Sequence, residues 1–273
     1  MALTRLQREL CRILAEQRIA SGESYVAGGA ALNELMRAPR VSRDIDLFHD
    51  TAEAVAATWE ADRRLLMDHG FEVRVLRERP TFVEAEAERG GERMVLQWLQ
   101  DSAYRFFPLV REEPFGLTLH PFDLATNKVL ALVGRLEVRD WIHTIESSER
   151  IQALGYLAWA ASGKDPGFSP ASILEQAARS ARYSADEVAA LDFDGPAPDA
   201  AALARRWREI LEEARAIVEA LPASEAGRCV LSADGSLFKG SCSSLRSALG
   251  LGEVRFHRGC IRGALPDLMA NGG

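Results

Sequence analysis

The chain has 273 residues, of which 47% are apolar and 27% charged, so it is long enough to bury one large core or two smaller ones. This composition excludes intrinsic disorder, a collagen-like repeat and a small disulfide scaffold. The net charge of −7, from 33 basic and 40 acidic residues, excludes a domain that binds nucleic acid through its overall charge. No run approaches the roughly 18 uncharged apolar residues of a membrane span, so we expect a soluble, cytoplasmic protein with no membrane partner.

Helices and strands are predicted to alternate over the first hundred residues. Apolar periodicity predicts, in chain order, helix 3–20, strand 24–27, helix 30–37, strand 44–48, helix 51–69 and strands 71–76, 81–88 and 93–99. Gly28 and Gly29 predict a turn between the first strand and the second helix, and Gly90 and Gly91 predict a hairpin between the last two strands. These elements predict a small mixed sheet with helices.

The second half of the chain is predicted to be mainly helical. The patterns predict helices over 122–134, 139–146, 151–161, 171–181, 185–191 and 200–221. The fold class is therefore α/β (α+β), with a mixed-sheet core followed by a mainly helical C-terminal region. We predict three regions: a core over 1–146, a helical domain over 147–222 and an extension over 223–273 whose structure the pattern does not define.

The stretch from Tyr25 to Asp50 carries the chemistry. Two glycines between a strand and a helix let phosphate oxygens approach backbone N–H groups at the positive end of the helix dipole. Asp44 and Asp46 follow on a strand, where residues two apart share a face and lie about 6–7 Å apart. Both carboxylates can therefore reach magnesium, which keeps substrate phosphates in its coordination shell. The pattern predicts a nucleoside triphosphate held by glycines and a metal ion.

The same residues resemble a known family. The run G-G-A-A-L through S-R-D-I-D-L-F resembles the core motif of the DNA polymerase β superfamily of nucleotidyltransferases, in the AbiEii/AbiGii toxin-like branch that includes the MenT toxins. Residues 121–145, PFDLATNKVLALVGRLEVRDWIHTI, resemble the second signature of that branch, in which a helix lysine precedes Arg-Asp. The resemblance covers about residues 20–145 and implies a nucleotidyltransferase core.

The resemblance implies roles for individual residues. It implies that Gly28 and Gly29 hold the triphosphate, that Asp44 and Asp46 bind Mg²⁺, that Lys128 contacts phosphate and that Asp140 completes the catalytic site. Two further residues at the entry of the aspartate strand belong to the predicted nucleotide-binding set, namely Ser42 and Arg43.

Lys128 is singled out by composition as well. Only three of the 33 basic residues are lysines, and Lys128 is the only one before residue 140. A flexible point charge suits a triphosphate, although a lysine on an apolar helix that extends its ammonium to the surface is the alternative interpretation.

One residue departs from the family pattern. Many members place a third carboxylate on the strand after the hairpin, where this chain has Gln97. An amide cannot accept a proton as a general base, so the usual two-metal catalysis requires another carboxylate. Asp101, Glu86 and Asp140 are the candidates.

Three functions remain open at this point. The first is transfer of a nucleoside monophosphate from an NTP to the 3′ end of tRNA, as a toxin with a cognate antitoxin. The second is the same transfer to a protein or small-molecule hydroxyl. The third, motivated by Gln97, is a catalytically impaired nucleotide-binding protein.

Overall fold

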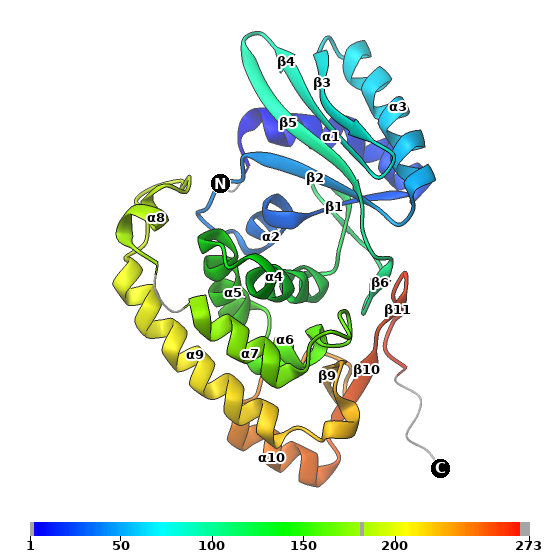
Figure 1. Cartoon of the computed structure of the whole chain (residues 1–273). Coiled ribbons are helices and arrows are strands. Elements are labelled where there is room, and N and C mark those ends of the chain that lie inside the picture. Colours follow the sequence, from blue (N-terminus) through cyan, green and yellow to red (C-terminus); the bar gives the residue numbers. More distant parts are fainter. Residues whose placement is uncertain (1–2, 181–182, 268–273) are drawn as a thin grey trace. The chain divides into compact units, whose positions relative to one another are not determined.

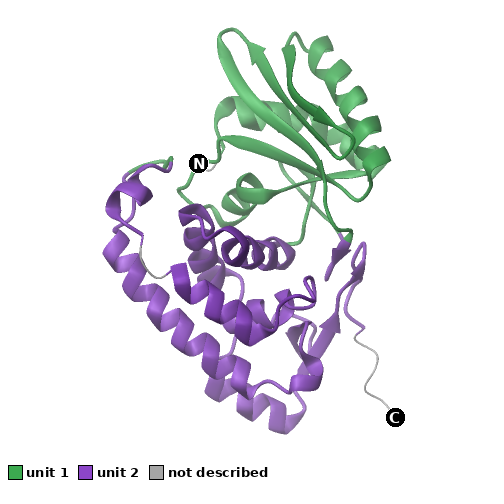
Figure 2. Cartoon of the chain, viewed as in Figure 1, with its two compact units in different colours: residues 1–103, 109–120, 192–195 green, residues 104–108, 121–191, 196–273 purple. Residues whose placement is uncertain are grey.

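The computed structural model describes residues 3–180 and 183–267 and divides the chain into two compact units (Figure 2). Unit 1 comprises Met1–Ala103, Leu109–His120 and Asp192–Gly195, and unit 2 comprises Tyr104–Pro108, Pro121–Leu191 and Pro196–Gly273. The boundary expected at residue 146 lies within a helix of unit 2, α5 (Val138–Arg150). Residue 181 of a predicted helix and residues 268–273 of the predicted extension lie outside the described residues.

Unit 1 is built on a seven-stranded mixed sheet (Figure 1). From edge to edge, its strands are β3 (Glu72–Arg79), β4 (Phe82–Arg89), β5 (Glu92–Gln100), β2 (Asp44–His49), β1 (Ser24–Ala27), β8 (Gly116–Thr118) and β7 (Val110–Glu112). The β2–β5 and β1–β8 pairs are parallel, and the other neighbours are antiparallel. The predicted hairpin between β4 and β5 is confirmed, and both of its glycines have positive φ.

Two helices cover one face of this sheet, α1 (Arg5–Ser21) and α3 (Ala52–Asp68). Burial alternates along β2, β4 and β5, as it does in strands with one face in the core. On the covered face, the ring centroids of Trp98 and Trp59 lie 4.7 Å apart. Nε1 of Trp98 donates a hydrogen bond to the Asp62 carboxylate (2.8 Å). The other face carries the partly exposed polar side chains of the same strands, including both aspartates of β2.

The predicted turn at Gly28 and Gly29 is wrong in one respect. Both glycines form the first residues of the helix α2 (Gly28–Met36), which follows β1 without a separate turn. Gly28 has φ 72°, a backbone conformation that residues with a Cβ rarely adopt, so it makes the reversal from strand to helix in one residue. The N-terminus of α2 is therefore placed directly at the end of β1.

Two short strands of the sheet were not predicted. β7 and β8 have three residues each, and the parallel pairing of β8 with β1 is given by a single register pair, Val26 with Thr118. Elements this short carry too little alternation to be recognised from sequence. They extend the sheet beyond β1.

Unit 2 is mainly helical. Its α-helices are α4 (Pro121–Arg135), α5 (Val138–Arg150), α6 (Leu154–Ala161), α7 (Pro170–Ala177), α8 (Ala185–Ala189), α9 (Ala200–Ala220) and α10 (Cys242–Leu251). Two short 3₁₀ helices are η1 (Ala178–Ser180) and η2 (Ala223–Glu225). Two-stranded pairs are formed by β9 (Arg228–Ser232) with β10 (Val254–Arg258) and by β6 (Tyr104–Arg105) with β11 (Cys260–Ile261). No helix in the described part of the chain is long and apolar enough to cross a membrane.

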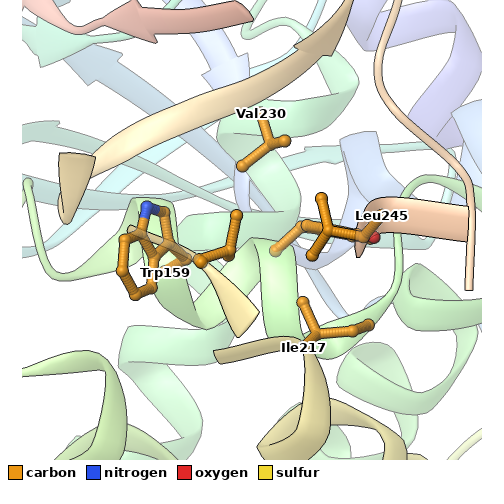
Figure 3. Packing of buried hydrophobic residues seen from close by; sticks show 6 residues of the cluster. Trp159, Ile217, Val230 and Leu245 are labelled. Atoms are coloured by element: carbon orange, nitrogen blue, oxygen red, sulfur yellow. The ribbon is translucent and has the colours of Figure 1, made fainter. Parts of the chain in front are cut away.

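The core of unit 2 forms around α6, whose eight residues are all buried. A helix that is apolar on every side requires neighbours on every side, and α4, α5, α7, α9 and β9 supply them. Figure 3 shows Trp159 of this helix in one cluster with Ile217, Val230 and Leu245. The segment after residue 222 therefore contributes to the core of unit 2 through β9 and α10.

Buried His49 predicts a dependence of stability on pH. Its Nδ1 lies 3.3 Å from the Leu99 carbonyl, and burial lowers the pKa of His49 from 6.5 to about 4. The folded state therefore favours neutral His49, so this contribution to stability is present above pH 6.5 and is lost as the pH falls toward 4. Between those values the free energy of unfolding should fall by about 3 kcal/mol through this residue.

The measurement compares wild type with His49→Gln by urea unfolding across this pH range. Burial also raises the pKa of Asp62 to about 6, which makes its own contribution change in the opposite direction. The difference between the two proteins isolates His49, and a difference that does not change with pH would contradict the prediction.

Candidate functional site

The two predicted metal-binding aspartates lie on β2, near the middle of the unit 1 sheet (Figure 1). Asp44 and Asp46 share the face away from α1 and α3, while Ile45 and Leu47 between and after them are buried in the core. Ser42 is buried just before the strand, and its Oγ donates to Asp44 Oδ1 (3.3 Å). The core on one face thus fixes the strand, and the strand presents both carboxylates on the other face.

Gly28 and Asp46 meet at the end of β1. Ala27 is paired with Asp46 in the β1–β2 register, and the next residue is Gly28. A Cβ at Gly28 would overlap Oδ2 of Asp46, so the carboxylate lies against the glycine backbone. The absence of a side chain at Gly28 is required by this contact as well as by its φ.

The start of α2 gives this corner a positive partial charge. Ala27 is its N-cap residue and makes no side-chain cap hydrogen bond. The first N–H groups of a helix have no partner within it, and the helix dipole favours anions at this end. Asp46, Gly28 and the N-terminus of α2 therefore combine a ligand for a cation with donors for an anion. This is the combination that a metal-bound triphosphate requires.

Arg43, which is predicted to bind nucleotide, forms an ion pair with Asp192 within unit 1. Its Nε lies 2.5 Å from Asp192 Oδ2, and the pair is largely exposed. Hydrogen bonding to Arg43 holds the pKa of Asp192 below its ordinary value. An exposed ion pair of this kind is easily exchanged for another anion, so the role of Arg43 stays a prediction.

Gln97 occupies the position beside Asp46. It lies opposite Asp46 in the β2–β5 register. Its Nε2 donates to Oε1 of Glu84 on β4 (2.8 Å). Sequence reasoning missed Glu84, although a two-residue turn at Gly90 and Gly91 pairs Arg89 with Glu92 and therefore Glu84 with Gln97.

The other candidate bases in unit 1 have structural partners. Glu86 lies opposite Val95 and forms an ion pair with Arg74 (2.9 Å). Asp101 accepts a hydrogen bond from the backbone N–H of Ser102 (2.8 Å).

Lys128 and Asp140 lie together in unit 2. The Lys128 Nζ is 3.2 Å from Asp140 Oδ1, and Arg135 Nε is 2.6 Å from Asp140 Oδ2. Burial alone would raise the pKa of Asp140, but hydrogen bonds and charge from Arg135 and Lys128 hold it below its ordinary value. Lys128 is only 8% exposed, so it is a buried member of an ion pair and not a surface lysine. Asp140 is therefore ionised at neutral pH and weakly basic.

The residues of unit 1 fit one magnesium ion. Two carboxylates on one strand face, one of them against a glycine backbone, are the number that Mg²⁺ takes when phosphates complete its shell. Among residues 3–180 and 183–267, no group of three or more His, Cys, Asp or Glu side chains is arranged to hold a metal. The fit therefore requires oxygens of the substrate in addition to those of the protein.

Comparison with known proteins identifies the fold. No protein-family model and no curated protein matches this chain. Its structure is similar to that of MenT4, a nucleotidyltransferase toxin of Mycobacterium tuberculosis H37Rv, with a TM-score of 0.50 and 17% identity over 80% of this chain and 84% of MenT4. The chain has a nucleotidyltransferase fold. The predicted α/β class and the resemblance to nucleotidyltransferases are confirmed at the level of the fold.

Two Helicobacter pylori structures also match. JHP933 has a TM-score of 0.48 and 13% identity over 80% of this chain and 95% of its own. A protein proposed to be a nucleotidyltransferase has a TM-score of 0.46 and 12% identity over 78% of this chain and 95% of its own.

Gly28→Ala tests the corner of the site. The new methyl group would displace the Asp46 carboxylate, so we expect loss of NTP binding together with backbone strain of about 1–3 kcal/mol. Gly22→Ala is the matched control, because Gly22 has φ 68° but nothing within 4 Å of its Cβ position. Both variants should unfold at lower temperature, and only Gly28→Ala should lose binding in an NTP titration. Equal NTP affinity in the two variants would contradict this geometry.

Proposed function

We propose that this chain is a Mg²⁺-dependent nucleotidyltransferase that transfers a nucleoside monophosphate from an NTP to an acceptor hydroxyl and releases pyrophosphate. The observation that carries the proposal is the contact of the Asp46 carboxylate with Gly28 at the start of α2. The MenT4-like fold supports it independently.

In this proposal, different residues of unit 1 bind the triphosphate and the metal ion. Gly28 and Gly29 bring backbone N–H groups to the triphosphate, and Asp44 and Asp46 hold the metal ion, with Ser42 orienting Asp44. Bound Mg²⁺ would neutralise the charge that develops on the phosphates. Roles of Lys128 in contacting phosphate and of Asp140 in the reaction stay predictions of the sequence resemblance, as does the role of Arg43.

For the acceptor we propose the 3′ end of tRNA, with the protein acting as a toxin that a cognate antitoxin counteracts. The likeness to a nucleotidyltransferase toxin supports the toxin role. Nucleotide addition to the tRNA 3′ end would block aminoacylation, which gives the toxin role a mechanism.

The test incubates the protein with each of four α-labelled NTPs and Mg²⁺, and with total tRNA, total lysate protein or small-molecule hydroxyl acceptors in parallel. We expect label in the tRNA pool, lost when EDTA is added. Label in protein or in small molecules would overturn the choice of acceptor. No label in any pool, with NTP binding intact, would overturn the enzyme proposal in favour of a nucleotide-binding protein.

A further inference from the structure

An amide stands between two carboxylates on the face of the sheet that carries the proposed site. Gln97 on β5 lies opposite Asp46 on β2, and Glu84 on β4 lies opposite Gln97. All three side chains are partly exposed, on the face away from α1 and α3. The row across three neighbouring strands is therefore carboxylate, amide, carboxylate.

The hydrogen bond to Glu84 determines which end of the amide faces β2. An ionised carboxylate only accepts hydrogen bonds, so Gln97 must present its NH₂ group to Glu84, and Nε2 lies 2.8 Å from Glu84 Oε1. With its NH₂ group held by Glu84 on β4, the amide can direct its carbonyl oxygen toward β2, where Asp46 lies opposite Gln97. Within the part of the chain that the structure describes, this oxygen accepts no hydrogen bond.

Glu84 differs from the next glutamate on the same face. Glu86 is paired with the guanidinium of Arg74. The register partner of Glu84 on β3 is Arg77, whose guanidinium lies instead over the Phe82 ring, 5.9 Å from its centroid. Among the described residues, Gln97 is the hydrogen-bond partner of the Glu84 carboxylate. This carboxylate is therefore committed to the amide and not to an ion pair.

We propose that Gln97 supplies its carbonyl oxygen as a neutral ligand to the divalent cation beside Asp44 and Asp46, and that Glu84 is the positioning residue that keeps this oxygen turned toward β2. The inference rests on the proposed function. Side-chain carbonyl oxygens are ordinary ligands of hard cations, and outer-shell hydrogen bonds commonly orient such ligands. Gln97 then takes the place of the family's third carboxylate, and the two aspartates alone balance the charge of one divalent cation.

The test measures Mn²⁺ binding by electron paramagnetic resonance, with and without a mixture of NTPs. Glu84→Gln is compared with Glu86→Gln, which removes the same charge from the same strand face. A glutamine at 84 either donates or accepts, so Gln97 is free to turn its NH₂ group toward the cation. We expect Mn²⁺ affinity to fall about 10-fold or more in Glu84→Gln, the range for loss of an outer-shell partner, and far less in Glu86→Gln.

Repeating the Glu84→Gln change in a Gln97→Asp protein separates the effect of amide orientation from the effect of the lost Glu84 charge. A carboxylate presents oxygen whichever way it turns, so in Gln97→Asp the extra loss caused by Glu84→Gln should disappear. Equal losses in Glu84→Gln and Glu86→Gln, or an extra loss that persists with Gln97→Asp, would overturn the positioning role.

Asp46→Asn distinguishes failure of this inference from failure of the proposed function. If Asp46→Asn loses Mn²⁺ while the two glutamate variants behave alike, only the positioning role is overturned. If Asp46→Asn binds Mn²⁺ as wild type does, or wild type binds none even with NTPs, the metal assignment of the proposed function fails as well.

Discussion

Asp46→Asn is expected to abolish Mg²⁺-dependent nucleotidyl transfer while leaving the fold intact. The carboxylate lies against Gly28 at the start of α2. Losing a direct ligand should cost more than the roughly 100-fold upper range for outer-shell partners. Without metal, the thermal transition should be unchanged or higher, because Asp44 no longer faces a like charge two residues away on the same strand face.

The measurement is label transfer from NTP alongside a thermal melt, with Asp101→Asn as the control. Asp101 directly follows β5, and its carboxylate accepts a hydrogen bond from the backbone N–H of its neighbour Ser102, so this change removes a charge outside the proposed set of metal ligands. Transfer at the wild-type rate in Asp46→Asn, or equal losses in both variants, would contradict the metal assignment.

Asp140→Asn is expected to destabilise the chain strongly. It removes the Asp140 carboxylate from the buried Lys128 ammonium, and it also removes the 2.6 Å ion pair between Asp140 and Arg135. Breaking one side of a buried ion pair typically costs about 3–5 kcal/mol. Adding Lys128→Met should recover most of this loss, since Arg135 is 43% exposed and can be solvated.

The double variant also separates stability from activity. Urea unfolding should show a lower midpoint for Asp140→Asn and near wild-type stability for Lys128→Met with Asp140→Asn. If that stable double variant transfers no label, the pair serves the reaction and not only the fold. A double variant as unstable as Asp140→Asn would contradict the buried-pair argument, and wild-type transfer would show that the roles implied for Lys128 and Asp140 are wrong.

The sequence predicted the elements that carry the site because each has a strong local pattern. β1 was predicted at its observed bounds, and β2 within one residue, since apolar positions alternate with Asp44 and Asp46. The start of α2 was predicted two residues too late, because Gly-Gly is typical of a turn. Only the contact with Asp46 shows why the helix begins at Gly28. The local pattern thus located both aspartates on a strand, but it did not predict the contact between Asp46 and Gly28.

Hairpin register and long-range packing account for what else was missed. A two-residue turn at Gly90 and Gly91 places Glu84, and not Glu86, opposite Gln97, so this pairing follows from the sequence once the turn is assigned. The strands and helix after residue 223 have weak local signals and are defined by packing, such as that of Leu245 against Val230 and Ile217. Pairing and packing between distant segments are properties of the folded chain, and single-sequence patterns do not contain them.

The most direct test of the proposed site is a crystal structure with Mn²⁺ and a non-hydrolysable NTP analogue, read by anomalous scattering from the metal. We predict an anomalous peak coordinated by the carboxylates of Asp44 and Asp46, with the triphosphate at the backbone N–H groups of Gly28 and Gly29. A bound triphosphate with no metal at these aspartates, or a metal and nucleotide bound elsewhere in the chain, would contradict it.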